Sequence, residues 1–179
     1  MPGITQRSTK PPILKSTFIS HGTLECRDIF ATRRFYEEVL GLEVAQQASL
    51  ALIVRLGGHH VYAVIETPDN DQEMPLLNHN GIDLGTREEV DEAHVKMQEI
   101  KDEYGIRKLT SPVLQHGTYS FYLQDLDGNW WEICYLPKNG FDFRFDSGVD
   151  LTGREDLSAA EIRSRLQRPL EHVTDRTYD

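Results

Sequence analysis

The sequence predicts an α+β fold made of two consecutive β-α-β-β-β modules. Three observations point to this class: short segments in which apolar and polar residues alternate, two longer segments with apolar residues at helical spacing, and the recurrence of the same order in both halves. A single sheet of four strands would leave one apolar face exposed, so the halves must cover each other or a second subunit. We therefore expect a curved mixed sheet around a cleft, with both helices outside.

The chain divides into four expected segments. These are an N-terminal arm at 1–16, a first module at 17–75, a second module at 76–137 and a charged C-terminal tail at 138–179. The arm carries three prolines and has no periodicity, which is typical of a mobile or wrapping segment. In the tail, residues 156–168 form a short amphipathic helix pattern that Pro169 ends.

The first module begins with a strand pattern over 17–24. Asp28 is a suitable N-cap for a helix over 28–40, and Gly41 is a suitable residue to end it. Three strands are expected after this helix, at 42–44, 50–56 and 60–66, and the last two are joined in a hairpin at Gly57-Gly58.

The second module repeats this order. A short strand is expected at 78–84, and the pair Thr86 and Glu89 forms a capping box at the start of a helix over 87–104 that Gly105 ends. The remaining strands are expected near Val113, at 119–124 and at 130–136, with a turn at 125–129 before the last.

Composition argues against several classes of protein. The 19 Lys and Arg residues against 29 Asp and Glu residues give a net charge of -10, which repels a phosphate backbone, so nucleic-acid binding is not expected. No apolar run approaches the roughly 20 residues that cross a bilayer, and the N-terminus lacks a signal-peptide pattern. Cys26 and Cys134 are far apart in apolar surroundings, which is typical of buried reduced thiols in a cytoplasmic protein.

Four chemically active residues occupy corresponding places in the two halves. His21 and His79 lie in the first strand of their modules, whereas Glu66 and Glu132 lie in the last. Around a pseudo-twofold axis such positions converge on the cleft. Imidazole and carboxylate groups together suit a divalent first-row metal, and two His with one carboxylate leave coordination positions open for other ligands. The sequence therefore predicts a metal site.

Two other features are weaker candidates. His59 and His60 are adjacent in an expected hairpin, and adjacent strand residues point to opposite faces, so both cannot enter one metal site. Trp130 is expected to share a face with Glu132 by the same alternation, which makes it a candidate wall for an aromatic ligand.

Two motifs resemble those of the vicinal-oxygen-chelate superfamily, which includes glyoxalases, bleomycin resistance proteins and extradiol dioxygenases. The segment His21-Gly-Thr-Leu, followed by Phe35-Tyr36-Glu-Glu-Val-Leu-Gly-Leu42, resembles the opening of the family, and Asp125-Leu-Asp-Gly-Asn-Trp-Trp-Glu132 resembles its closing motif. The resemblance covers residues 16–136. It implies the glyoxalase-like fold, with His21, His79 and Glu132 as ligands of one divalent cation and a small molecule as the substrate.

Within the superfamily the sequence is most similar in motif to type I extradiol dioxygenases. His116 precedes the pair Phe121-Tyr122, which is followed by the Asp125 turn and by Glu132, although Leu126 replaces the proline usual in that turn. This resemblance implies Fe(II), with manganese, nickel and zinc as alternatives, and dioxygen and a catechol-like aromatic ring as substrates. It also implies that His116 is the acid-base group and that Tyr122 hydrogen-bonds a substrate oxygen.

Two other functions stay open. A glyoxalase-like isomerase or epimerase would use Glu66 as a fourth metal ligand and as the base that moves a proton next to a carbonyl. A metal-free binding protein of the same superfamily is the third alternative, and the presence of His21, His79 and Glu132 argues against it. We expect a homodimer or a higher homo-oligomer, with the modules pairing either within one chain or across two.

Overall fold

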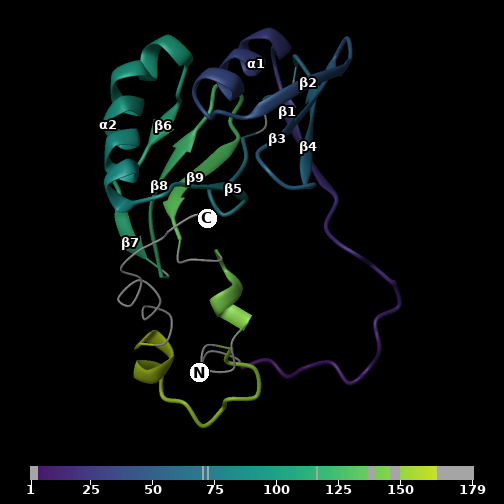
Figure 1. Cartoon of the computed structure of the whole chain (residues 1–179), viewed down its shortest axis with the longest axis vertical. Helices are drawn as coiled ribbons and strands as arrows, with labels where there is room; N and C mark the ends of the chain where they lie inside the picture. The colour runs from purple at the N-terminus through teal and green to yellow at the C-terminus, as the bar shows by residue number, and fades with distance from the viewer. Residues whose placement is uncertain are drawn as a thin grey trace.

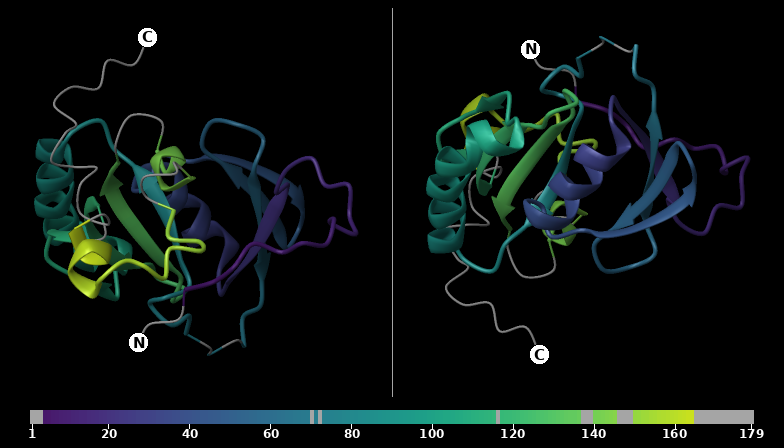
Figure 2. Two further views of the ribbon diagram at one scale, coloured as in Figure 1. Left: turned by 90° about the horizontal axis from the view of Figure 1, so that it is seen from below. Right: turned by 90° about the horizontal axis from the view of Figure 1, so that it is seen from above.

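The computed structural model describes residues 4–69, 71, 73–115, 117–136, 140–145 and 150–164. It is an α+β structure with two mixed sheets, so the predicted fold class is confirmed. Figures 1 and 2 show α2 on the flank of one sheet, whereas α1 lies between the two sheets. The second helix is therefore outside as expected, but the first is not.

The first sheet is built from the first module. Its elements are β1 (His21–Cys26), α1 (Ile29–Glu38), β2 (Glu43–Ala48), β3 (Ala51–Arg55) and β4 (Val61–Glu66). The strand order is β1-β4-β3-β2, with β1 parallel to β4 and the other pairs antiparallel. The predicted hairpin between β3 and β4 is confirmed, and Gly57 and Gly58 both adopt positive φ angles there, of 60° and 53°.

The second sheet repeats this plan with one addition. Its elements are β5 (His79–Asp83), α2 (Arg87–Tyr104), β6 (Lys108–Leu109), β7 (Val113–Gln115), β8 (Thr118–Gln124) and β9 (Trp130–Tyr135). The strand order is β5-β9-β8-β6, and β7 also pairs with β8. The single strand expected near Val113 is thus two short strands, because both pair with different parts of the longer β8.

Capping residues set the helix ends. Asp28 accepts hydrogen bonds from the backbone N–H groups of Phe30 and Ala31, as an N-cap does. At α2 the predicted capping box of Thr86 and Glu89 is present, and Gly105 ends the helix at a φ angle of 69°.

The strand expected at 17–24 begins later, at His21. The residue that pairs with His21 is Val61, the first residue of β4, and the Val61 N–H donates to the Ser20 carbonyl at 3.2 Å, so the pairing of the two strands begins there. In the tail, residues 159–164 are helical and a 3-10 helix, η1, spans Asp142–Phe145. Of the helix expected at 156–168, residues 156–158 are not helical, and residues 165–168 lie outside the described residues.

The N-terminal arm leaves β1, loops away from the modules and returns to the tail (Figure 1). Arg7 Nη2 lies 2.7 Å from Asp150 Oδ2, and Gln6 Nε2 donates to Glu155 Oε1 at 2.7 Å. These contacts join the two segments that lie outside the modules. In the part of the chain that the structure describes, no helix is long and apolar enough to span a membrane.

One apolar core links the sheets and helices. In the first sheet the face toward α1 carries Leu24, Leu52 and Val64, which are at 2% exposure or less. The opposite face carries His21, Ile53 and Val61, which are exposed or half-buried because no helix among the described residues covers them. Both cysteines are buried free thiols, as predicted.

The turn at 125–129 joins the modules through a buried carboxylate. Asp125 Oδ2 accepts hydrogen bonds from Tyr36 Oη of α1 at 3.3 Å and from Trp131 Nε1 at 3.0 Å. Its neighbour Asp127 accepts from Thr32 Oγ1 at 2.6 Å and from the Arg27 backbone at 2.8 Å. Burial raises the pKa of Asp125 to about 6. The turn at 125–129 therefore connects the two modules and also leads directly into β9, the strand that carries Glu132.

Candidate functional site

His79 and Glu132 face each other from neighbouring strands. His79 begins β5 and Glu132 lies in β9, which runs parallel to it. The His79 Nε2 and Glu132 Oε2 atoms are 3.4 Å apart, and the two side chains are 28% and 10% exposed. The pair is therefore shielded from bulk water while one edge of the imidazole stays accessible.

Two hydroxyl groups orient the Glu132 carboxylate. Ser120 Oγ donates to Glu132 Oε1 at 2.7 Å, and Tyr122 Oη donates to the same oxygen at 3.1 Å. All three side chains lie on the face of the sheet opposite α2, because strand residues of one parity share a face and Tyr122 pairs directly with Glu132. With Oε1 held by two donors, Oε2 is the oxygen directed at His79.

A backbone carbonyl fixes the tautomer of His79. The Nδ1 atom lies 2.8 Å from the Leu76 carbonyl oxygen, which can only accept, so Nδ1 carries the proton. In the neutral ring the Nε2 lone pair then points toward Glu132. Metal-binding histidines are held in this way, with the second ring nitrogen donating to a carbonyl or carboxylate.

The distance between His79 Nε2 and Glu132 Oε2 fits two atoms that bind the same metal ion. Two ligand atoms, each about 2.1 Å from a metal at a tetrahedral angle, lie about 3.4 Å apart. However, among the described residues no group of three or more His, Cys, Asp and Glu side chains could hold a metal ion. The part of one chain that the structure describes thus brings together two side chains of metal-ligand type without a third.

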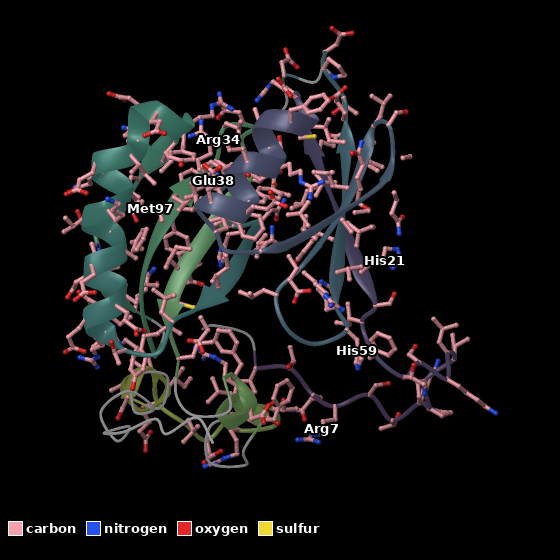
Figure 3. All side chains as sticks on the ribbon, turned by 45° about the horizontal axis from the view of Figure 1, so that its top comes forward. Arg7, His21, Arg34, Glu38, His59 and Met97 are labelled. Atoms are coloured by element: carbon pink, nitrogen blue, oxygen red, sulfur yellow. The ribbon has the colours of Figure 1, made fainter. Side chains whose placement is uncertain are left out.

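His21 lies on the outer face of the first sheet. Its Nδ1 is 2.8 Å from Ser20 Oγ, and the residue is exposed. Figure 3 shows its side chain projecting from β1 on the side away from α2. The structure therefore does not bring His21 to His79 and Glu132 within one chain.

Glu66 lies on the opposite face of that sheet from His21. It pairs with the buried Cys26, whereas His21 pairs with Val61, five residues earlier in β4. Its Oε2 accepts a hydrogen bond from the Ile29 backbone at the start of α1, at 2.7 Å. The expected equivalence with Glu132 is thus wrong in register. Glu132 is two residues beyond the partner of His79, and the residue two beyond the partner of His21 is Ala63.

Of the other predicted site residues, the structure describes Tyr122 and Trp130 but not His116. Tyr122 lies at the site, with its ring in edge contact with the His79 ring at 5.0 Å between centroids. Burial and the Glu132 carboxylate raise the pKa of Tyr122 to about 12, so its hydroxyl stays protonated at neutral pH. Trp130 shares the Glu132 face and donates through Nε1 to the Met74 carbonyl at 3.0 Å. His116 lies outside the described residues.

Two residues of the site were not predicted from the sequence. Ser120 is fully buried, and its hydroxyl donates the shorter of the two hydrogen bonds to Glu132. Gln115 Nε2 donates to Tyr122 Oη at 3.1 Å. The available signal was alternation, since Ser120 and Tyr122 share the parity that places them on one face. Ser120 and Gln115 are not the imidazole, thiolate or carboxylate side chains that a first-row metal favours, so a pattern of metal ligands does not include them.

Comparison with known proteins gives a family and a fold. The sequence matches the model of the glyoxalase/bleomycin resistance protein/dioxygenase superfamily over residues 18–133. No curated protein matches the chain significantly in sequence.

Several solved structures share the fold at low sequence identity. A possible glyoxalase from Bacillus cereus is 22% identical with a TM-score of 0.54, covering 66% of this chain and 98% of its own. A glyoxalase/bleomycin resistance protein/dioxygenase from Nocardioides is 18% identical with a TM-score of 0.51, covering 69% of this chain and 85% of its own. The oxidase ChaP-H2 is also 18% identical with a TM-score of 0.51, covering 68% and 95%. At these identities the likeness concerns the fold alone.

Proposed function

This chain belongs to the glyoxalase/bleomycin resistance protein/dioxygenase superfamily, and we propose that within it the protein is an Fe(II)-dependent extradiol-type dioxygenase. Its metal would be held by His79, Glu132 and His21. The observation that carries the proposal is the oriented pair of His79 Nε2 and Glu132 Oε2, 3.4 Å apart. A histidine and a carboxylate that are oriented in this way would supply two of the three ligands of a two-His, one-carboxylate metal site.

We further propose that His21 reaches this pair from a second copy of the chain. Among the described residues of one chain, no third ligand is available and no helix covers the face that carries His21. That face also carries Ile53, Val61, Ala63 and Ile65, all half-buried. Covering these apolar side chains with the Glu132 side of another copy would bury them and complete the site. In a twofold dimer this contact occurs twice.

The side chains around the pair have defined roles in this proposal. When bound, Fe(II) would supply the redox chemistry by which a catechol and dioxygen react side by side. Tyr122, held protonated by its raised pKa, donates its one hydroxyl proton to Glu132 in this structure and would turn that proton to an oxygen of the substrate when one is bound. Ser120 would keep Oε1 from turning toward the metal position. His116 would exchange protons with the substrate.

The position of Glu66 favours this reaction over proton transfer. The isomerase alternative requires Glu66 as ligand and base, but its Oε2 binds the first turn of α1. Moving it to the His21 face would require β4 to shift in register, which would turn the buried Val64 outward.

Anaerobic reconstitution with Fe(II) followed by oxygen uptake on a panel of catechols tests the function. We expect one bound iron per chain and oxygen consumption with at least one catechol. His79→Ala should lose most of the metal. Full iron occupancy with no oxygen uptake on any catechol would contradict the dioxygenase, and an iron content unaffected by His79→Ala would contradict the site.

A further inference from the structure

A cavity lies between the two sheets, away from the His79–Glu132 pair. Its volume is about 500 Å³, and it opens beside the loop that joins β3 and β4. The cavity lies on the other side of the second sheet from the candidate metal site, because Trp131 lines it and Glu132 is the next residue of β9. We call it the inter-sheet crevice.

The inner walls of the crevice are apolar and aromatic. They are formed by Leu42 and Val54 from the first module and Ile82 and Trp131 from the second, with Tyr62 between them. The Tyr62 and Trp131 rings lie 6.5 Å apart at 73°, so one ring presents its edge to the other. A cavity of this size and composition is typical of a site for a small organic molecule with a flat ring.

Asn80 supplies an unsatisfied polar group at this wall. Its Nδ2 atom is buried and has no hydrogen-bond partner. Leaving such a donor unpaired is unfavourable. Asn80 is itself half-buried and lines the crevice. Because its Nδ2 atom is buried, the side chain would have to rotate to bring this donor to an oxygen bound in the crevice. A ligand with a suitable acceptor would satisfy the group that the folded chain leaves unpaired.

Polar side chains gather at the mouth of the crevice. His59 and His60 both line it, because both precede the first residue of β4. The His60 ring lies 5.0 Å from the Tyr62 ring, and its Nδ1 is 3.0 Å from the Ile19 carbonyl. A carbonyl can only accept, so Nδ1 carries the proton. Arg55, at the same rim, is already paired with Glu43 at 2.8 Å.

From these observations we propose that the inter-sheet crevice binds a small planar aromatic molecule that carries a carbonyl or carboxylate oxygen. The ring would lie against Trp131 and Tyr62, and the oxygen would accept a hydrogen bond from Asn80. The proposal is independent of the proposed dioxygenase activity, because the crevice contains neither His79 nor Glu132.

Titration of the metal-free protein with benzamide, benzoate and toluene tests the proposal. The indole N–H signals in an NMR spectrum report the location, because Trp131 lines the crevice and Trp130, the other tryptophan, lies on the opposite face. We expect benzamide or benzoate to shift the Trp131 signal with a Kd on the order of 1 mM, and toluene to bind about 10-fold more weakly.

Asn80→Leu is the matched variant, because it keeps the side-chain volume and removes the amide. We expect the preference for the oxygen-bearing ligand over toluene to fall from about 10-fold to about 1-fold, while thermal stability is kept or raised since an unpaired polar group is lost. Absence of binding by all three probes at about 10 mM would overturn the proposal. So would an oxygen preference that Asn80→Leu leaves intact, or a shift confined to Trp130.

Discussion

Tyr122→Phe tests whether the hydrogen bonds to Glu132 orient its carboxylate for metal binding. The change removes one hydroxyl and keeps the ring that contacts His79 at 5.0 Å. Glu132 Oε1 then retains a single donor, Ser120, of the two that orient it. Loss of one outer partner of a ligand costs roughly 10–100-fold in metal affinity. The Tyr122 bond, at 3.1 Å, is longer than the Ser120 bond at 2.7 Å, so we expect about 10-fold weaker binding.

Tyr119→Phe is the matched control for this variant. Tyr119 lies in the same strand but on the other face, where its hydroxyl donates to Asp91 Oδ1 at 2.6 Å. Competition with a chromogenic chelator, using Mn²⁺ as an air-stable probe, measures the affinity of both variants and of the wild type. We expect the control to bind within about 2-fold of the wild type, since it touches neither ligand. Equal losses in the two variants, or no loss in Tyr122→Phe, would refute the argument.

Three further predictions concern Glu66, Asp125 and Gly22. Glu66→Gln should leave metal affinity unchanged and lower the free energy of unfolding by about 0.5–1 kcal/mol, because it removes a charge from the start of α1; a 10-fold loss of metal in a chelator competition would restore the isomerase alternative. The raised pKa of Asp125, about 6 against 3.8, means that its contribution to stability is present below pH 4 and is lost as the pH rises through 6. Compared with Asp125→Asn, the free energy of unfolding of the wild type, measured in urea titrations, should therefore fall by about 3 kcal/mol between pH 4 and pH 6. A difference in unfolding free energy between the two proteins that does not change with pH would argue against a buried ionising group. Gly22→Ala should lower stability by about 1–3 kcal/mol, because the new Cβ would lie 2.6 Å from the Tyr62 ring, whereas Gly81→Ala meets nothing within 4 Å and should change it little; similar unfolding midpoints would contradict this packing.

Much of the fold could be predicted because its signals are local. The caps at Asp28 and Thr86, the hairpin glycines and the alternation in each strand all depend on a few neighbouring residues. The repeat then follows from their order. The place of α1 between the sheets could not be predicted, because it depends on contacts distant in sequence, such as that of Tyr36 with Asp125.

Register limited the prediction of the site. The order of strands suggests that Glu66 corresponds to Glu132. However, Glu66 shares a face with His21 only if it lies an even number of positions from the residue of β4 that pairs with His21. Val61 is that residue, and Glu66 is then an odd number of positions away. His79 and Glu132 do share a face, because β5 and β9 pair at a register that places Glu132 two residues beyond the partner of His79.

Metal occupancy of a mixed dimer tests most directly the claim that two copies of the chain complete the site. His21→Ala and His79→Ala chains, carrying different tags, would be co-expressed and the metal content of each preparation measured. We predict little metal in either variant alone and about a quarter of the wild-type content in the mixture, since half of the dimers are mixed and each mixed dimer has one intact site. A mixture with no more metal than its parents, or a His21→Ala protein with full occupancy, would contradict the shared site.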